Sequence, residues 1–405
     1  MSGRPFLQIP GPTNLPERIV RAMSRPVIDH RSPEFAALTR AVVPALRQVF
    51  GTREGAVIIY PASGTGAWEA SLVNVLAPGQ RVLAFEHGHF SALFAQTARN
   101  LGFEVDIIPL PWGQPAAAEV LEARLRADRG PRPYQAVLAV HNETSTGVTS
   151  NIGALREAMD SAGHEALLIV DAVSSLASLA FCFDDWRVDV ALTGSQKGLM
   201  LPPGLGIVCA SPRAIERGQS GGSPRNFFDW RPILRDSAAG FFPYTPATLL
   251  LFGLREALTM LVVEEGLDGV YARHRLLAEG VRAAVHAWGL ANLCAQPACY
   301  SNTLTAVVMP DGIDSDAIIR RARERFGLSL GVGLGRLKGK VMRIGHLGAL
   351  NELEVLATLG GLEMALLECG VPLALGSGVA ACQHVFVRTP AGLSRQSGPS
   401  PAEPA

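Results

Sequence analysis

The chain has 405 residues, of which 48% are hydrophobic and 18% are charged, and its 36 basic and 36 acidic side chains leave no net charge. Such a composition excludes a disordered chain, and the length predicts two or three domains with large buried cores. The lack of a basic excess argues against nonspecific binding to nucleic acid, so small-molecule partners fit better. No run of about 18 apolar residues predicts a membrane-spanning helix.

The two ends of the sequence and its cysteines carry no targeting or metal signal. The start lacks the apolar core of a signal peptide, and the last residues are not a peroxisomal tripeptide. Among the six cysteines only Cys294 and Cys299 are close in sequence, and no second pair accompanies them. We therefore expect a soluble cytoplasmic protein without a metal site.

Seven short apolar runs rich in β-branched residues predict strands that are buried on both faces. They cover residues 57–60, 81–85, 105–110, 136–141, 166–173, 188–193 and 206–210. Segments with helical spacing lie between several of them, at 67–75, 90–101 and 152–162. This alternation predicts an α/β fold with a mostly parallel sheet and helices on both faces. The last two strands are joined by a link too short for a helical crossover, so one antiparallel strand is expected there.

The second part of the chain predicts a smaller α+β domain. Residues 249–290 read as two long helices, after which predicted strands (303–309, 341–345) alternate with predicted helices (314–326, 353–368). We expect four parts with no flexible linker between the second and the third. They are an N-terminal arm (1–20), a large domain (21–265), a small C-terminal domain (266–388) and a disordered tail rich in Pro, Ser and Gly (389–405).

Lys197 is the first candidate for chemistry, because it follows a predicted buried strand in the sequence TGSQKG (193–198). An isolated lysine in such a loop ordinarily keeps its amine in water. The small neighbours leave room for a planar cofactor, however, and burial or a cationic neighbour readily lowers the pKa of a lysine. Such a lysine is suited to form a Schiff base.

Asp171 lies near the end of the predicted strand 166–173 and therefore faces the carboxyl edge of the sheet, where α/β proteins bind ligands. Alone it could be a helix N-cap. Together with Lys197, which follows the next strand, it gains another meaning. A carboxylate of this kind keeps a pyridine nitrogen protonated, and protonation makes the ring an electron sink.

The loop PASGTGA (61–67) joins the first predicted strand to a predicted helix. Its small residues would let the backbone approach a phosphate, and the helix N-terminus would supply amide donors. The same sequence could be an ordinary capped turn. It has neither the Walker lysine nor the GxGxxG pattern.

Arg343 lies in a strand-like segment of the small unit. It could be a solvated cation on the face of a strand. It could instead bind a substrate carboxylate, since only the planar guanidinium offers two parallel hydrogen bonds to that group.

Taken together, these segments resemble the class V aminotransferases of fold type I, and most closely the alanine/serine–glyoxylate aminotransferase group. The likeness extends from about Phe6 to about Val379. It rests on residues 9–16, 63–65, 142–147, 171–175, 195–197 and 343–345.

The resemblance implies pyridoxal 5′-phosphate as the cofactor and gives each matching residue a role. Lys197 would form the Schiff base, and Asp171 would pair with the pyridine nitrogen. Val173 and Phe90 would pack on the ring, and Thr144 would reach the ring hydroxyl. Relatives often have Trp at the position of Phe90. The phosphate would be held by Ser63, Gly64, Thr65 and Gln196.

The substrate and partner roles follow in the same way. Arg343 would bind the α-carboxylate with help from Ser175. Family members are homodimers with shared active sites, and Thr245 would reach the phosphate of the other subunit. Phe242 stands where mammalian relatives have Tyr, and Thr65 where some relatives have His.

The resemblance implies transfer of an amino group from L-serine, the preferred donor, or from L-alanine to glyoxylate. The products would be glycine with hydroxypyruvate or pyruvate. One alternative is an aspartate–glyoxylate or other class V aminotransferase. A second, of a different class, is a non-catalytic binding or regulatory protein that kept the fold.

Overall fold

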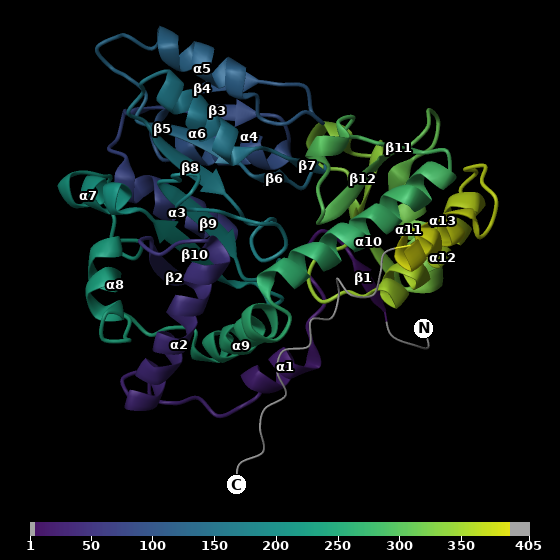
Figure 1. The fold of residues 1–405 in the computed structure, drawn as a ribbon, viewed down its shortest axis with the longest axis horizontal. Coiled ribbons are helices and arrows are strands. Elements are labelled where there is room, and N and C mark those ends of the chain that lie inside the picture. Colours follow the sequence, from purple (N-terminus) through teal and green to yellow (C-terminus); the bar gives the residue numbers. More distant parts are fainter. Residues whose placement is uncertain (1–4, 389–405) are drawn as a thin grey trace.

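Within residues 5–388, which the computed structural model describes, seven strands form a central sheet (Figure 1). Their order is β2-β10-β9-β8-β5-β3-β4, and only β10 runs antiparallel to its neighbours. The strands are β2 (Ala56–Ala62), β3 (Arg81–Glu86), β4 (Glu104–Pro109), β5 (Ala136–Val140), β8 (Leu167–Asp171), β9 (Val190–Gly194) and β10 (Gly204–Ala210). The predicted α/β fold and its one antiparallel strand are confirmed.

Helices cover both faces of this sheet, and β8 shows why its sequence is apolar throughout. Leu168 and Val170 pack into the core on one face, whereas Leu167 and Ile169 pack into the core on the other. The first core contains α2 (Pro33–Phe50), α5 (Ala118–Ala127), α6 (Ile152–Ser161) and α9 (Thr248–Leu258). The second contains α3 (Gly64–Val75), α4 (His89–Asn100), α7 (Pro212–Ser220) and α8 (Trp230–Ser237).

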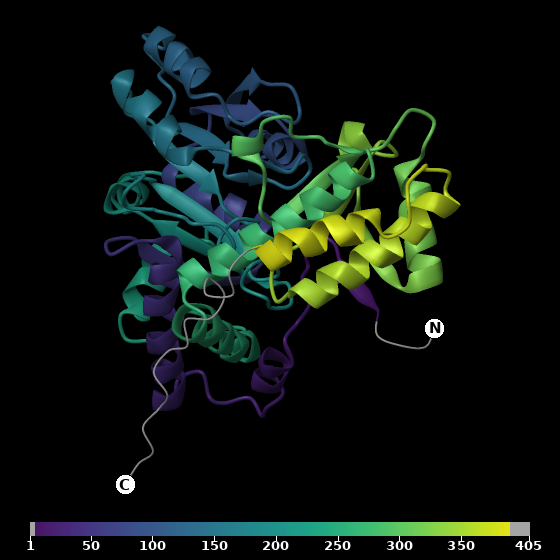
Figure 2. The ribbon, with the colours of Figure 1, turned by 45° about the vertical axis from the view of Figure 1, so that its right-hand side comes forward.

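A second, five-stranded sheet has the order β1-β13-β14-β12-β11 and a core of its own. Its strands are β1 (Phe6–Gln8), β11 (Ala291–Asn292), β12 (Leu304–Val308), β13 (Leu328–Val332) and β14 (Val341–Gly345). Its helices are α10 (Leu267–Ala287), α11 (Ser315–Phe326), α12 (Glu352–Glu368) and α13 (Ser377–Arg388). Figure 2 shows α12 and α13 side by side on the outside of this unit, with α10 behind them.

The N-terminal segment belongs to the second sheet, which the sequence pattern does not indicate. Phe6–Gln8 pairs in parallel with β13, more than 300 residues away in the chain. A strand of three residues leaves no periodic signal, so only the fold reveals this pairing. The predicted domain boundaries remain a prediction, and the predicted disordered tail 389–405 lies outside the described residues.

The two long helices predicted for residues 249–290 are present as α9 and α10. A π-helical turn (Thr259–Glu264) continues α9, and Gly266, with φ +74°, precedes α10. The remaining short elements are α1 (Glu17–Met23), β6 (Asn142–Glu143), β7 (Val148–Thr149) and 3-10 turns at Pro297–Cys299 and Gly335–Leu337.

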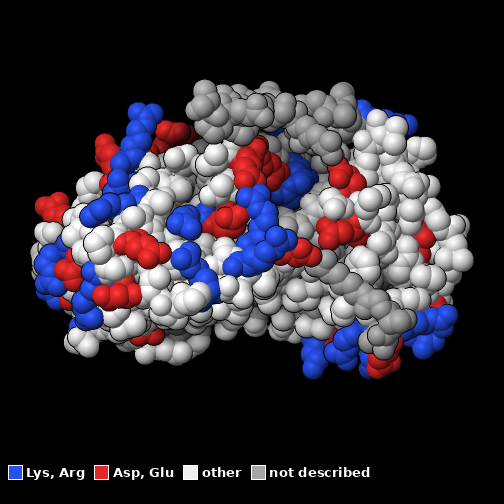
Figure 3. Space-filling model, turned by 90° about the horizontal axis from the view of Figure 1, so that it is seen from below, with Lys and Arg blue, Asp and Glu red and all other residues white. Residues whose placement is uncertain are grey.

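The surface carries both signs of charge. On the face drawn in Figure 3, basic and acidic side chains alternate over short distances, so that face does not present one continuous basic patch. No helix among residues 5–388 is both long and apolar enough to cross a membrane. Over the same residues, no group of three or more His, Cys, Asp or Glu is arranged to hold a metal ion.

Candidate active site

Polar side chains converge where β2, β3, β5, β8 and β9 end. These strands run in the same direction, so their carboxyl ends share one edge of the sheet, the edge where such sheets bind ligands. A cavity of about 150 Å³ lies there. Nine of the twelve predicted site residues line it, namely Ser63, Gly64, Thr65, Phe90, Thr144, Asp171, Val173, Gln196 and Lys197.

Lys197 follows β9, and its amine contacts the N-terminal segment of the chain. Its Nζ donates a hydrogen bond to the carbonyl oxygen of Pro10. Gly11, with φ +88°, permits this approach because a Cβ there would overlap the lysine side chain. Thr13 holds the same loop, since its N–H donates to the Gln196 carbonyl and its hydroxyl to the Lys197 carbonyl. The lysine is thus fixed by a segment to which the sequence pattern assigns no role in the site.

The surroundings of Lys197 favour its neutral form. Burial and the positive charge of Arg343 lower the pKa of Lys197 to about 8, and the negative charge of Asp171 acts in the opposite direction. A useful fraction of the amine is therefore unprotonated near neutral pH. Only the neutral amine can act as a nucleophile or accept a proton.

Asp171 is buried at the end of β8 and held by two donors. The N–H of Val173 donates to Oδ1 at 2.7 Å, and the indole N–H of Trp68 donates to Oδ2 at 2.9 Å. Burial raises the pKa of Asp171 to about 6, although both hydrogen bonds favour its charged form. A cationic group in the cavity would stabilise this carboxylate further, and the carboxylate would in turn keep that group protonated.

The turn before α3 is suited to bind an anion. Ser63 is the N-cap of this 12-residue helix, and its Oγ accepts from the N–H of Gly66 at 3.3 Å. The first amides of a helix have no partner within it, and the positive end of the helix dipole faces the same way. Gly64 is required because a Cβ there would lie 2.9 Å from a methyl group of Val173.

Gln196 adds a second sign of a ligand at this end of the cavity. Its Oε1 is buried and has no hydrogen-bond partner among residues 5–388. Buried polar atoms in folded proteins almost always have a partner. Because Oε1 is an acceptor and Gln196 lines the cavity, it indicates a place where a hydrogen-bond donor binds.

Arg343 does not line the cavity itself but is bonded to a residue that does. It lies on β14 of the second sheet and is largely buried. Its Nε donates to the Val332 carbonyl at 2.8 Å, and its Nη1 donates to the Thr144 carbonyl at 3.0 Å. Burial lowers the pKa of Arg343 to about 10, so it remains a cation at neutral pH. These two hydrogen bonds orient the guanidinium and use two of its five N–H donors.

Two other predicted residues lie outside the walls of this cavity. Ser175 is fully buried, and the neighbouring Ser174 lines the cavity in its place. Thr245 is exposed on the loop before α9 and does not line the cavity of its own chain. Their substrate and cross-subunit roles therefore remain predictions.

Sequence reasoning missed three wall residues that form hydrogen bonds, Trp68, Asn142 and Ser174. The pairing of Trp68 with Asp171 could have been predicted. A buried indole N–H needs an acceptor, and the carboxylate of Asp171 is expected at the same edge of the sheet. Asn142 donates to the hydroxyls of Ser174 and Thr303 at 2.8 and 2.9 Å. That network joins β6, the segment after β8 and the segment before β12, and no local sequence pattern indicates it.

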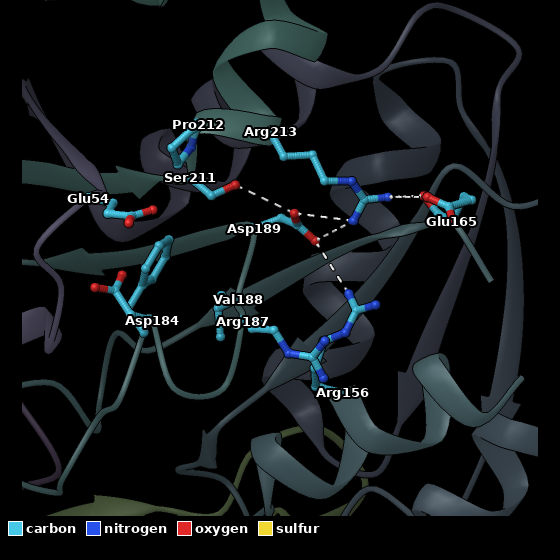
Figure 4. A pocket seen from close by; sticks show the side chains of 11 residues that line it. Glu54, Arg156, Glu165, Asp184, Arg187, Val188, Asp189, Ser211, Pro212 and Arg213 are labelled. Carbon is cyan, nitrogen blue, oxygen red and sulfur yellow. Dashed lines mark hydrogen bonds and ion pairs between the residues drawn. The ribbon is translucent and has the colours of Figure 1, made fainter. Parts of the chain in front are cut away.

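A larger hollow of about 650 Å³ lies at the opposite edge of the same sheet (Figure 4). Its centre is the buried Asp189, which immediately precedes β9. Arg213 and Arg156 approach Asp189 at 3.4 and 3.8 Å, and Arg187 pairs with Asp160. Because its arginines are already paired with carboxylates, this hollow is a structural ion-pair cluster rather than the candidate site.

A family model and several relatives point to the same family. A family model described as aminotransferase class V matches residues 6–335. The serine–glyoxylate aminotransferase of Methylorubrum extorquens is 49% identical over 393 residues, which cover 96% of this chain and 97% of that protein. The L-aspartate–glyoxylate aminotransferase of Paracoccus denitrificans is 43% identical, with coverages of 96% and 98%. The solved structure of ureidoglycine–glyoxylate aminotransferase from Bacillus subtilis matches with a TM-score of 0.87 and 28% identity, covering 96% and 99%.

Proposed function

This chain belongs to the class V aminotransferases, and we propose that it transfers the amino group of L-serine to glyoxylate, giving hydroxypyruvate and glycine. L-Alanine, which would give pyruvate, is the second donor. The relatives that support this proposal include enzymes named for serine and glyoxylate and for aspartate and glyoxylate. The arrangement that carries the proposal is the half-buried Lys197 in one cavity with the buried carboxylate of Asp171.

Pyridoxal phosphate is the cofactor of this family, and the residues of the cavity fit it. The helix N-terminus at the turn 63–65 suits its phosphate, and Gln196 would add its side-chain NH₂ group as a donor to the same phosphate. Asp171 suits its ring nitrogen, Thr144 its ring hydroxyl, and Lys197 its aldehyde. When bound, the cofactor supplies a protonated ring that withdraws electrons from the carbon bearing the amino group.

We assign proton transfer to Lys197. Its amine would hold the cofactor through a Schiff base, and the free amine would take the proton from Cα of the donor and later return it. A pKa of about 8 suits both steps, because a base works best when its pKa lies near the working pH. Asp171 would stay ionised and pair with the ring nitrogen, and Val173 and Phe90 would pack on the ring.

We propose that Arg343 binds the carboxylate of the substrate. Donor and acceptor both carry a carboxylate next to the reacting carbon, so one guanidinium can orient both. Glyoxylate has no side chain, and a narrow space beside Arg343 would favour it over larger oxo acids. Ser175 is retained as an assisting residue in this proposal.

We also propose that the protein acts as a cytoplasmic homodimer. Ser63 and Thr65 are exposed at the phosphate end of the cavity, so this end is open in a single chain. Thr245 is exposed as well, and a partner subunit could place it there. A second chain would then complete the phosphate site.

A donor screen with glyoxylate as acceptor tests the proposed reaction. Purified protein is loaded with pyridoxal phosphate and given L-serine, L-alanine or L-aspartate, and glycine formation is followed. We expect the highest kcat/KM with L-serine. A clear preference for L-aspartate would show that L-serine is not the donor. If no donor gives glycine, glyoxylate is not the acceptor.

A further inference from the structure

We propose that Glu143 is a positioning residue of this active site, because its carboxylate joins the backbone that carries Phe90 to the turn that carries Thr144 and, through this turn, orients Arg343. The proposal rests on the roles proposed above for Phe90 and Arg343. It concerns a residue that does not line the cavity in which substrate and cofactor would bind.

The carboxylate of Glu143 is fully buried and accepts four hydrogen bonds. Its Oε1 accepts from the N–H of Phe90 at 3.3 Å, and from the N–H and hydroxyl of Ser145 at 3.1 and 2.7 Å. Its Oε2 accepts from the N–H of Ser91 at 2.8 Å. The Ser145 hydroxyl in turn accepts from the N–H of His89 at 2.8 Å. One side chain therefore joins the start of α4 to the turn after β6.

A charged acceptor is needed in this place. The donors include first-turn amides of the 12-residue helix α4, where the helix dipole favours a negative charge. Hydrogen bonds to a carboxylate are also stronger than those between neutral groups. Gly88 makes space for it, because a Cβ on Gly88 would overlap Cγ and Cδ of Glu143. The backbone of Gly88 is extended, with φ −178°, so space rather than conformation requires glycine there.

The link to the substrate site passes through one residue. Thr144 directly follows Glu143, and its carbonyl accepts from Nη1 of Arg343 at 3.0 Å. A shift of the Glu143 turn would therefore move an acceptor that orients the guanidinium. The charge of Glu143 also acts on the site directly, since it favours the cationic form of Arg343 and helps to raise the pKa of Asp171.

Glu363 provides a matched control, because it has the same structural chemistry away from the cavity. It is buried and accepts from the backbone N–H groups of Gly376 and Gly378 at 2.8 and 2.7 Å, and from the indole of Trp288 at 2.9 Å. It thus holds the start of α13 much as Glu143 holds the start of α4. Loss of either charge should lower thermal stability, but only one of the two residues holds active-site groups.

The experiment compares Glu143→Gln with Glu363→Gln. For each variant we would measure the thermal midpoint, the Kd of the apo-protein for pyridoxal phosphate and for inorganic phosphate, and the KM values of the loaded enzyme. In Glu143→Gln, an NH₂ group would face a backbone N–H, so we expect about tenfold weaker pyridoxal phosphate binding and about tenfold higher KM for glyoxylate. Inorganic phosphate binding at α3 should be unchanged. Glu363→Gln should change only the thermal midpoint.

A second variant keeps the charge and moves the side chain. Gly88→Ala should displace Glu143 and reproduce both binding defects. If Glu143→Gln and Gly88→Ala lower only the thermal midpoint, as Glu363→Gln does, Glu143 is merely a helix cap and the proposal is wrong.

Two reference variants separate failure of this inference from failure of the roles on which it rests. Phe90→Ala should weaken pyridoxal phosphate binding, and Arg343→Ala should raise the KM of glyoxylate. If these references act as expected while Glu143→Gln does not, only the Glu143 inference fails. If Phe90→Ala and Arg343→Ala also leave the Kd for pyridoxal phosphate and the KM for glyoxylate unchanged, the proposed roles of Phe90 and Arg343 are wrong.

Discussion

Lys197→Ala is expected to abolish transamination, with kcat lower by at least about 10⁴-fold, the upper end of what one positioned general base contributes. The substitution removes both the covalent anchor of the cofactor and the base that moves the proton, and no other lysine can replace it. The chain has only three lysines, and the other two, Lys338 and Lys340, are exposed beside β14. The measurement is glycine formation together with the absorbance of the loaded protein.

Lys338→Ala is the control for this prediction, because it removes an exposed amine from the same chain. It should leave both the turnover and the cofactor absorbance unchanged. Turnover by Lys197→Ala within about tenfold of the unmodified protein would exclude this lysine as the general base.

Asp171→Asn is expected to lower kcat by about 10²- to 10³-fold while the fold is retained. This loss lies within the range of rate factors that a positioned acid or base contributes. Asparagine has the shape of aspartate and can still accept from the N–H of Val173, while its NH₂ group would face the indole N–H of Trp68. We therefore expect lower stability with the strand end in place. Asparagine lacks the charge that keeps the ring nitrogen protonated, and without that proton the ring is a poor electron sink. The loss should therefore appear in kcat, measured as glycine formation at saturating substrate.

Asp189→Asn is a matched control for this second prediction. Asp189 is another buried aspartate of the same sheet, but it lies at the opposite edge and accepts from the N–H of Leu168 at 2.8 Å. Its replacement should lower stability and leave kcat unchanged. Equal effects of both substitutions on kcat would mean that Asp171 acts through the fold alone.

The large sheet is predictable from the sequence because its strands are apolar on both faces and alternate with helices. The run that ends at Asp171 and the run that precedes Lys197 both follow this pattern, so each residue is expected at a strand end. Parallel strands bring their carboxyl ends to one edge, and the same rule therefore places Lys197, Asp171 and the 63–65 turn together.

The remaining features depend on contacts between distant parts of the chain. Pro10 touches Lys197 only because β1 joins β13, and Arg343 meets Thr144 only because the turn after β6 lies against β14. In the sequence, Glu143 is one polar residue in a polar turn. Its four donors come from α4 and from its own turn, and no local pattern shows that they converge.

Reduction of the cofactor-loaded protein with borohydride, followed by digestion and mass spectrometry, tests the central claim most directly. Borohydride fixes the cofactor to the amine that holds it, and a chain with three lysines leaves few possible positions. We expect the added mass on the peptide that contains Lys197. Added mass on the peptide that contains Lys338 and Lys340, or on none, would contradict it.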